Sequence, residues 1–147
     1  SATGGGTTKI GAQIEASGAT NNYAIIVPSA SGSVGIGNSA PTSTLDVTGG
    51  SFGLNYVAKT GTYPITATDY AINCTANTFT TTLPTAVGIV GRIYFITNSG
   101  AGTITLATTS SQTFANVVTT PTTLTLATLT GVVVMSDGAN WLKVSSF

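Results

Sequence analysis

The chain has 147 residues and no net formal charge, and only 5% of its residues are charged while 41% are hydrophobic. About a quarter of the residues in an average soluble domain are charged, so a surface this neutral has no electrostatic attraction for nucleic acid or anionic lipid. The apolar share argues against disorder, and no apolar run approaches the roughly 18 residues of a membrane span.

The first 55 residues are rich in Gly, Ala, Ser and Asn and poor in large side chains. Glycine raises the entropy cost of ordering a backbone, and so few bulky groups bury too little area to offset that cost in a single copy. Four short strands are nevertheless expected here: Ala12–Glu15, Tyr23–Val27, Val34–Ile36 and Leu45–Val47. We therefore expect residues 1–55 to form an intertwined fibre neck in which several copies of the chain share one core.

Residues 56–147 contain short runs rich in Thr, Val, Ile, Tyr and Phe, each closed by turn residues, and no credible helix pattern. Such runs predict strands. The predicted strands are Thr62–Thr66, Tyr70–Cys74, Phe79–Leu83, Arg92–Thr97, Thr103–Ala107, Phe114–Val118, Thr122–Leu126, Val132–Ser136 and Trp141–Val144. So many short strands predict an all-β head, a β-sandwich of the jelly-roll kind.

Local patterns in this half also predict which faces are buried. The clearest hairpin spans Gly131–Val144, because Asp137-Gly138 supplies the positive φ that a tight reversal needs. The alternation of threonine with Ile or Leu in Thr103–Leu106 and Thr123–Leu126 predicts one buried and one solvated face. Cys74 is the only cysteine, so it has no internal disulfide partner, and we interpret it as a small buried hydrophobe.

Residues 34–49 read VGIGNSAPTSTLDVTG. This segment resembles the VGIGT-x-x-P-x-x-x-LDV-x-G pattern of phage tail fibres and bacterial trimeric surface fibres, where it commonly lies upstream of a tip or of a self-cleaving chaperone. It departs from that pattern at Asn38, where threonine is usual, and at Ala40. The resemblance implies a homotrimer.

A second resemblance covers most of the remaining chain. The segments YPITATDYAI, FTTTLP, GRIYFI and SDGANW, which begin at Tyr63, Phe79, Gly91 and Ser136, are similar to the pattern of phage-fibre-type β domains. Together the two resemblances imply the extracellular end of a homotrimeric fibre or adhesin, carried on a virion tail or a cell surface, with a neck at residues 1–55 and a head at residues 56–147.

Catalysis is not expected. The sequence contains no histidine, which excludes Ser-His-Asp and Cys-His nucleophiles and histidine-based metal sites. Glu15, Asp46, Asp69 and Asp137 are the only carboxylates available for a glycosidase pair, and their positions in the neck, beside a strand and in a turn do not predict one. We expect no cofactor, and we interpret the oxygen-rich run Ser136–Asn140 as a turn and not as a calcium site.

Binding is then the expected function, with a target-cell surface glycan or polymer as the ligand and no nucleic-acid or membrane partner. Sugar recognition needs a flat aromatic with amide and hydroxyl groups around it. Tyr94 alternates with Phe95, and Phe95 is the better candidate for the interior, which leaves Tyr94 as an exposed contact. The candidate ligand-binding residues are Arg92, Tyr94, Asn98, Ser99, Asn140 and Trp141.

Two of these candidates have competing structural interpretations. Trp141 opens a predicted strand, where a core position is favoured over a sugar platform. Arg92 occurs three times in a trimer and is suited to clamp an acidic sugar, but it is also placed to pair with Asp69 or to end a strand in solvent.

Two other functions remain open. The head is also suited to a purely structural role, capping the fibre without a ligand of its own. An ice-binding surface is suggested by Thr-x-Thr steps that begin at Thr80, Thr103 and Thr123. The steps follow one another after 23 and 20 residues, and no repeating coil is apparent in such uneven spacing.

Overall fold

The structure is a computed structural model of the chain and describes residues 33–147. These residues belong to two compact units, which divide between Phe52 and Gly53. All regular secondary structure in the described part is β-strand, which confirms the predicted all-β class, and this part contains no helix that could cross a membrane. The predicted strands Ala12–Glu15 and Tyr23–Val27 lie outside the described residues.

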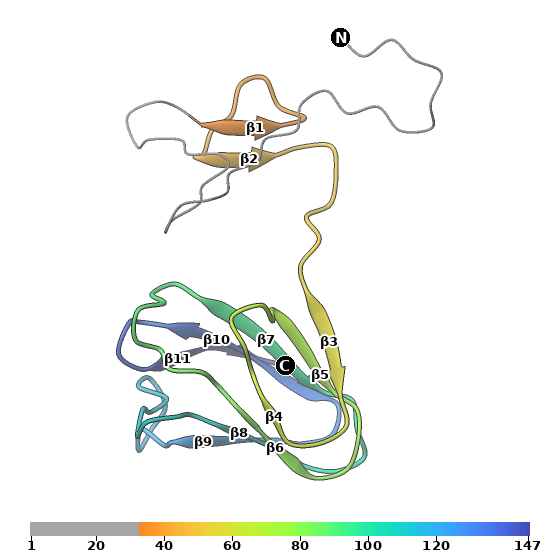
Figure 1. Ribbon diagram of the computed structural model, residues 1–147, viewed down its shortest axis with the longest axis vertical. Helices are drawn as coiled ribbons and strands as arrows, with labels where there is room; N and C mark the ends of the chain where they lie inside the picture. Colours follow the sequence, from red (N-terminus) through yellow and green to blue (C-terminus); the bar gives the residue numbers. More distant parts are fainter. Residues whose placement is uncertain (1–32) are drawn as a thin grey trace, which may run out of the picture. The chain divides into compact units, whose positions relative to one another are not determined.

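The first unit contains a pair of parallel strands, β1 (Val34–Ile36) and β2 (Leu45–Val47), with the bounds that the sequence predicts (Figure 1). Val34 pairs with Leu45, and Ile36 pairs with Val47. Apolar side chains of this pair stay in solvent, because Ile36 is 55% exposed and Leu45 is 52% exposed. The pair therefore has no core of its own within the described residues.

The loop between β1 and β2 explains the glycines and the aspartate of the VGIG…LDV segment. A Cβ atom on Gly35 would collide with the carbonyl oxygen of Asn38, and Gly37 has a φ of +70°, which favours glycine. The Asp46 carboxylate accepts hydrogen bonds from the Thr42 amide at 3.0 Å and from Asn38 Nδ2 at 3.0 Å. The residues of the motif thus hold the loop that lets two strands run parallel.

The second unit contains two sheets (Figure 1). The five-stranded sheet has the order β11-β10-β7-β5-β3 and the four-stranded sheet the order β4-β6-β8-β9. The strands of the first are β3 (Tyr56–Lys59), β5 (Ala71–Cys74), β7 (Ile93–Asn98), β10 (Thr130–Ser136) and β11 (Trp141–Ser146). Those of the second are β4 (Tyr63–Pro64), β6 (Phe79–Thr82), β8 (Ile104–Ala107) and β9 (Thr123–Leu126).

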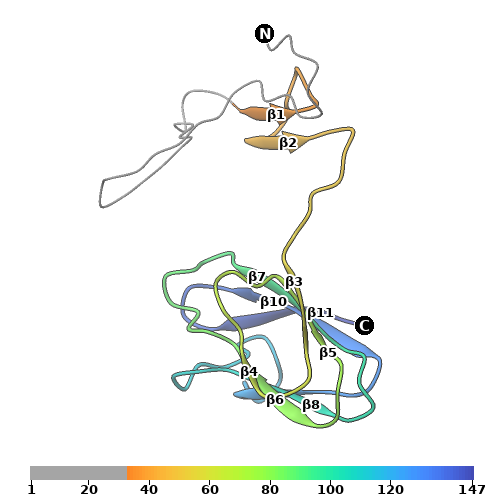
Figure 2. The same ribbon diagram turned by 45° about the vertical axis from the view of Figure 1, so that its right-hand side comes forward.

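From β3 to β8 the chain alternates between the two sheets, and each strand joins its sheet parallel to the previous one (Figure 2). Strands β9, β10 and β11 then add antiparallel to their neighbours. The predicted hairpin is confirmed as β10 and β11, with Gly138 at a φ of +97° in its turn. The parallel half differs from the antiparallel pairing of a jelly roll.

The core of this unit lies between the two sheets. Alternate residues of the strands face inward, so Ile72 and Cys74 of β5 and Ile104 and Leu106 of β8 are buried while their neighbours are half-buried. The largest fully buried side chain is Trp141. The buried state predicted for Cys74 is confirmed, and that burial raises the pKa of its thiol to about 11.

One strand prediction in the head is wrong, and one strand of the head was not predicted. The segment Phe114–Val118 forms only an isolated bridge between Phe114 and Trp141 and continues as turns. The Phe114 ring is fully buried, so this apolar run serves to anchor a loop in the core and not to extend a sheet. In contrast, β3 was not predicted, because its sequence Tyr-Val-Ala-Lys does not alternate between apolar and polar residues and none of the four is buried.

Candidate functional site

The expectation that Tyr94 is exposed and Phe95 buried is wrong, because the structure reverses the two. Tyr94 is fully buried, whereas Phe95 is 36% exposed and packs against the Tyr70 ring at 5.2 Å between centroids. Burial of the tyrosine is tolerated because its hydroxyl donates a hydrogen bond to the Thr66 carbonyl oxygen at 3.1 Å. Tyr94 is therefore a core residue and presents no face to a ligand.

Arg92 lies beside the same loop. Its guanidinium donates from Nη1 to the Ala67 carbonyl oxygen at 2.6 Å. The Asp69 carboxylate is occupied by other donors, the Thr66 amide at 2.7 Å and the Tyr63 hydroxyl at 2.8 Å. Burial raises the pKa of Asp69, but these hydrogen bonds and the charge of Lys59 outweigh it and bring the pKa below its usual value.

Asn98 and Ser99 lie at the other end of β7, and the two side chains differ in their exposure to solvent. Asn98 is 1% exposed, and its Nδ2 donates to the carbonyl oxygens of Gly102 at 2.7 Å and Leu126 at 2.9 Å. Its amide is thus used to close a loop and to join the two sheets. Ser99 is exposed, and its hydroxyl donates to Asn73 Oδ1 at 2.8 Å.

Asn140 and Trp141 lie at the β10–β11 hairpin. Asn140 is half-buried and accepts a hydrogen bond at Oδ1 from the Thr113 amide at 3.0 Å. Trp141 is fully buried, as its structural interpretation predicts, and its indole N–H donates to the Pro84 carbonyl oxygen at 3.3 Å. The six predicted site residues therefore do not form one site, and most of their polar atoms are used to hold loops.

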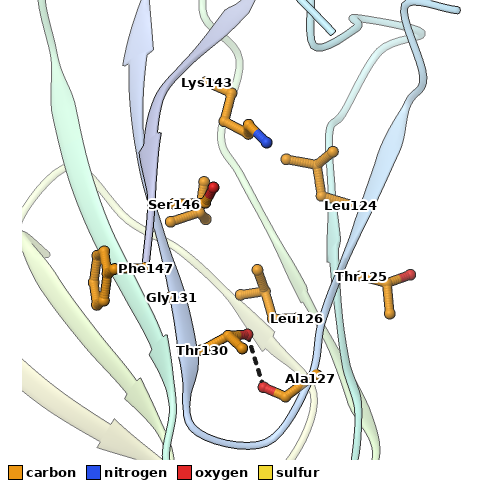
Figure 3. Close-up of a pocket in the computed structure, with 10 residues that line it drawn as sticks. Leu124, Thr125, Leu126, Ala127, Thr130, Gly131, Lys143, Ser146 and Phe147 are labelled. Carbon is orange, nitrogen blue, oxygen red and sulfur yellow. Dashed lines mark hydrogen bonds between the residues drawn. The ribbon is translucent and has the colours of Figure 1, made fainter. Parts of the chain in front are cut away.

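A pocket of about 390 Å³ lies elsewhere, between β9 and β11, the end strands of the two sheets (Figure 3). This volume is within the range of small-molecule sites. Its apolar wall comes from Leu124 and Leu126 of β9 and from Val132 of β10. Lys143 and Ser146 of β11 contribute a cation and a hydroxyl, and in Figure 3 both side chains point toward the two leucines.

The rim of this pocket also contains Thr130 and Phe147. The Thr130 hydroxyl donates to the Ala127 carbonyl oxygen at 2.8 Å and closes the lower end of the pocket in Figure 3. The Phe147 ring lies across the strand from the leucines and covers Gly131, where a Cβ atom would come within 2.6 Å of the ring. The pocket interior is thus aliphatic, with the ammonium and hydroxyls at its edge.

Sequence reasoning missed this pocket. Lys143 was visible as one of four cations, and the alternation of Leu124 and Leu126 predicted a buried face. No sequence pattern, however, indicates that β9 and β11 end their sheets side by side. The pocket depends on strand order, which is a long-range property.

The outer face of the four-stranded sheet has an array of threonines. The uneven spacing of these threonines in the sequence did not predict the array. Thr80 of β6 pairs with Thr105 of β8, which pairs with Thr125 of β9. Thr82 and Thr123 flank Ala107 in a second row. The loops differ in length, but the strand register still lines these hydroxyls up in rows across the sheet. Within a row, neighbouring strands are about 4.8 Å apart, the ordinary distance between paired strands.

Comparisons with known proteins add no relative. No protein-family model matches the chain, and neither a curated protein nor a solved structure shows significant similarity to it. Within residues 33–147, no three His, Cys, Asp or Glu side chains gather where they could hold a metal ion. The pocket and the threonine rows are therefore judged on their own chemistry.

Proposed function

We propose that the chain is the tip of an extracellular homotrimeric fibre, and that it binds an acidic glycan or polymer on a target cell without catalysis. The observation that carries the ligand proposal is the pocket between β9 and β11, where an ammonium and hydroxyls border an aliphatic wall. The fibre itself follows from the resemblance of residues 34–49 to the neck segments of trimeric fibres.

The chemistry of the pocket suits an acidic sugar. A pyranose ring presents C–H groups on its faces and hydroxyls on its edge, and the Leu124 and Leu126 side chains offer a matching apolar wall. Lys143 has three N–H donors for a carboxylate, and the Ser146 hydroxyl both donates and accepts. Among the described residues that line the pocket none is Asp or Glu, so the pocket lacks the pair of carboxyl groups that glycoside hydrolysis needs.

Exposed apolar side chains in the first unit support the assembly. A two-stranded sheet is marginal in water by itself. Ile36 and Leu45 are more than half exposed, and Phe52 is 66% exposed. Several copies that pack these side chains against one another would supply the core that the strand pair lacks. Three heads on one fibre would then convert a weak single-site affinity into a higher apparent one.

Two measurements test this proposal. Light scattering of the full chain should give about three times the chain mass of 14.6 kDa. A glycan array should show binding to glycans with carboxylate groups, which Lys143→Met reduces at least tenfold because the cation is lost. Lys59→Met is the matched control, since Lys59 lies over the Tyr63 ring, 3.8 Å from its centroid, and lines no part of the pocket.

Each outcome decides between functions. A monomeric chain would contradict the fibre. A trimer that binds no glycan would favour the capping role, and binding that Lys143→Met leaves unchanged would exclude the pocket as the site.

The threonine rows favour a second candidate, adsorption to ice. Threonine hydroxyls in a regular two-dimensional array present a flat surface to an ordered lattice, and the pairing of Thr80, Thr105 and Thr125 supplies one row of that array. Inhibition of ice recrystallisation by the full chain, abolished by Thr105→Lys, would support this function. Recrystallisation at the rate seen with an inert protein would eliminate it.

A further inference from the structure

We propose that the outer face of the five-stranded sheet is the contact between heads in the homotrimer. We call it the outer apolar face and define it by Ala71, Ile93, Phe95, Val133, Met135 and Leu142. The inference rests on the trimer of the proposed function and adds to it the surface through which the heads meet. It also leaves the pocket and the threonine rows on the other parts of the head for ligands.

Strand register places these six side chains in two adjacent rows. Phe95 pairs with Ala71 on one side and with Val133 on the other. In the second row Met135 lies between Ile93 and Leu142.

Inward-facing neighbours fix the direction of both rows. Tyr94, Ile96, Val132 and Val134 are buried in the core, so the residues that alternate with them along β7 and β10 face away from it. The Tyr70 ring, at 5.2 Å from the Phe95 ring, adds to the first row.

The outer apolar face bears no charge. The second unit has five charged residues, Lys59, Asp69, Arg92, Asp137 and Lys143, and none occupies an outward position of the five strands. Lys59 pairs with the buried Cys74, and Lys143 pairs with the buried Val134.

Ordinary sheets that face water show polar residues on that side. At one end of this sheet the outward positions are polar, since Asn73 pairs with Thr97 and accepts a hydrogen bond from its hydroxyl at 3.1 Å. The outer apolar face beside them is uncharged and has aromatic and methionine side chains, which is the composition of the centre of a protein interface.

Size and charge together point to further copies of this chain as the partner. The whole outer side of this sheet, with five strands spaced by about 4.8 Å and four to seven residues in each at about 3.3 Å, has a footprint of roughly 300–550 Å². A stable interface usually buries about 800 Å² on each partner, so this face is too small to hold free molecules together.

The small size of this face is sufficient when the heads are tethered to one another through their necks. Copies joined through their necks meet at an effective concentration in the millimolar range, where a small apolar contact is sufficient. A second copy also presents a neutral surface, so no charge is buried without a partner.

Cysteine accessibility in the full-length protein tests the inference. Ala71→Cys places a thiol in the outer apolar face with a minimal change of volume, and Thr105→Cys places a matched thiol on the outer face of the other sheet. Native Cys74 is buried and stays silent. We expect a maleimide to modify Ala71→Cys at least tenfold more slowly than Thr105→Cys. We expect Met135→Lys, added to Ala71→Cys, to remove that protection, because Met135 lies in the second row and does not pair with Ala71.

The outcomes separate this inference from the proposed function. If the chain is trimeric and the two thiols react at similar rates, or if Met135→Lys leaves a slow Ala71→Cys unchanged, the outer apolar face is not the contact and the trimer stands. If light scattering gives the mass of a monomer, the trimer fails and this contact fails with it. Thr125→Lys in place of Met135→Lys should leave the protection intact, because Thr125 lies on the opposite sheet.

Discussion

The rings of Tyr94 and Trp141 pack against each other in the core, with centroids 5.6 Å apart and 46° between their planes. The Tyr94 hydroxyl donates a hydrogen bond to the Thr66 carbonyl oxygen, and the Trp141 indole N–H donates one to the Pro84 carbonyl oxygen. The two aromatics that the sequence offered as sugar platforms therefore join the five-stranded sheet to two loops. Their loss should affect stability before it affects binding.

Replacement of Trp141 by alanine should be among the most destabilising single changes in the head. Truncation of a fully buried large aromatic leaves a cavity and costs about 3–5 kcal/mol. We expect the free energy of unfolding, measured by urea denaturation of the full chain, to fall by about that amount. Val118→Ala is the control, since Val118 is 88% exposed, and its effect should stay within about 0.5 kcal/mol. Similar losses for the two variants would contradict the buried position of Trp141.

Acid should weaken the head through Asp69. Hydrogen bonds from Thr66 and Tyr63 lower the pKa of this carboxyl despite its burial, so the native state binds its proton less readily than the unfolded chain does. The stabilisation is therefore present above the usual pKa of 3.8 and is lost as the pH falls through the lowered pKa of the folded protein.

The free energy of unfolding should fall less between pH 6 and pH 2.5 in Asp69→Asn than in the wild type. Unfolding curves recorded at the two pH values measure this difference. Asp137→Asn provides a comparison, because two backbone amides in its turn also lower the pKa of that carboxyl. An equal acid loss in wild type and Asp69→Asn would contradict the role assigned to Asp69.

Alanine at Gly35 should loosen the loop of the first unit. The new methyl group would collide with the Asn38 carbonyl oxygen, which is backbone and has little freedom to move. We expect limited proteolysis within residues 33–52 to be at least several-fold faster in Gly35→Ala than in the wild type. Gly50→Ala should change nothing, since no atom lies within 4 Å of a Cβ there. Equal cleavage of both variants would show that the loop tolerates the methyl group.

Cys74 should be inert in the folded protein. Burial raises the pKa of its thiol to about 11, so almost no thiolate forms at pH 8, and reagents have no access to the sulfur. We expect a disulfide reagent to react with Cys74 only at the rate of unfolding and to react rapidly in denaturant. Thr105→Cys serves as the positive control for reagent access. Fast modification of the native wild type would mean that β5 opens readily.

Much of the architecture was predictable because its signals are local. The bounds of β1 and β2 follow from short apolar runs between glycines, and the β10–β11 hairpin follows from Asp137-Gly138 in its turn. The burial of Cys74 follows in the same way from alternation along its strand. The stretch from Phe114 to Val118 shows the limit of such signals, because an apolar run in a loop and one in a strand look alike.

The sequence by itself determined that the chain is all-β, that it is almost without charge, and that Tyr94 and Phe95 face opposite ways. Only the tertiary structure decided which of the two faces the core, because alternation defines two faces and leaves open which one another sheet covers. The pocket at Lys143 exists because the strand order places β9 and β11 at the ends of their sheets. The threonine rows and the outer apolar face exist because the strand register aligns their side chains. These features bring together residues far apart in the chain, and such pairings depend on the free energy of the whole packed core and not on any local preference.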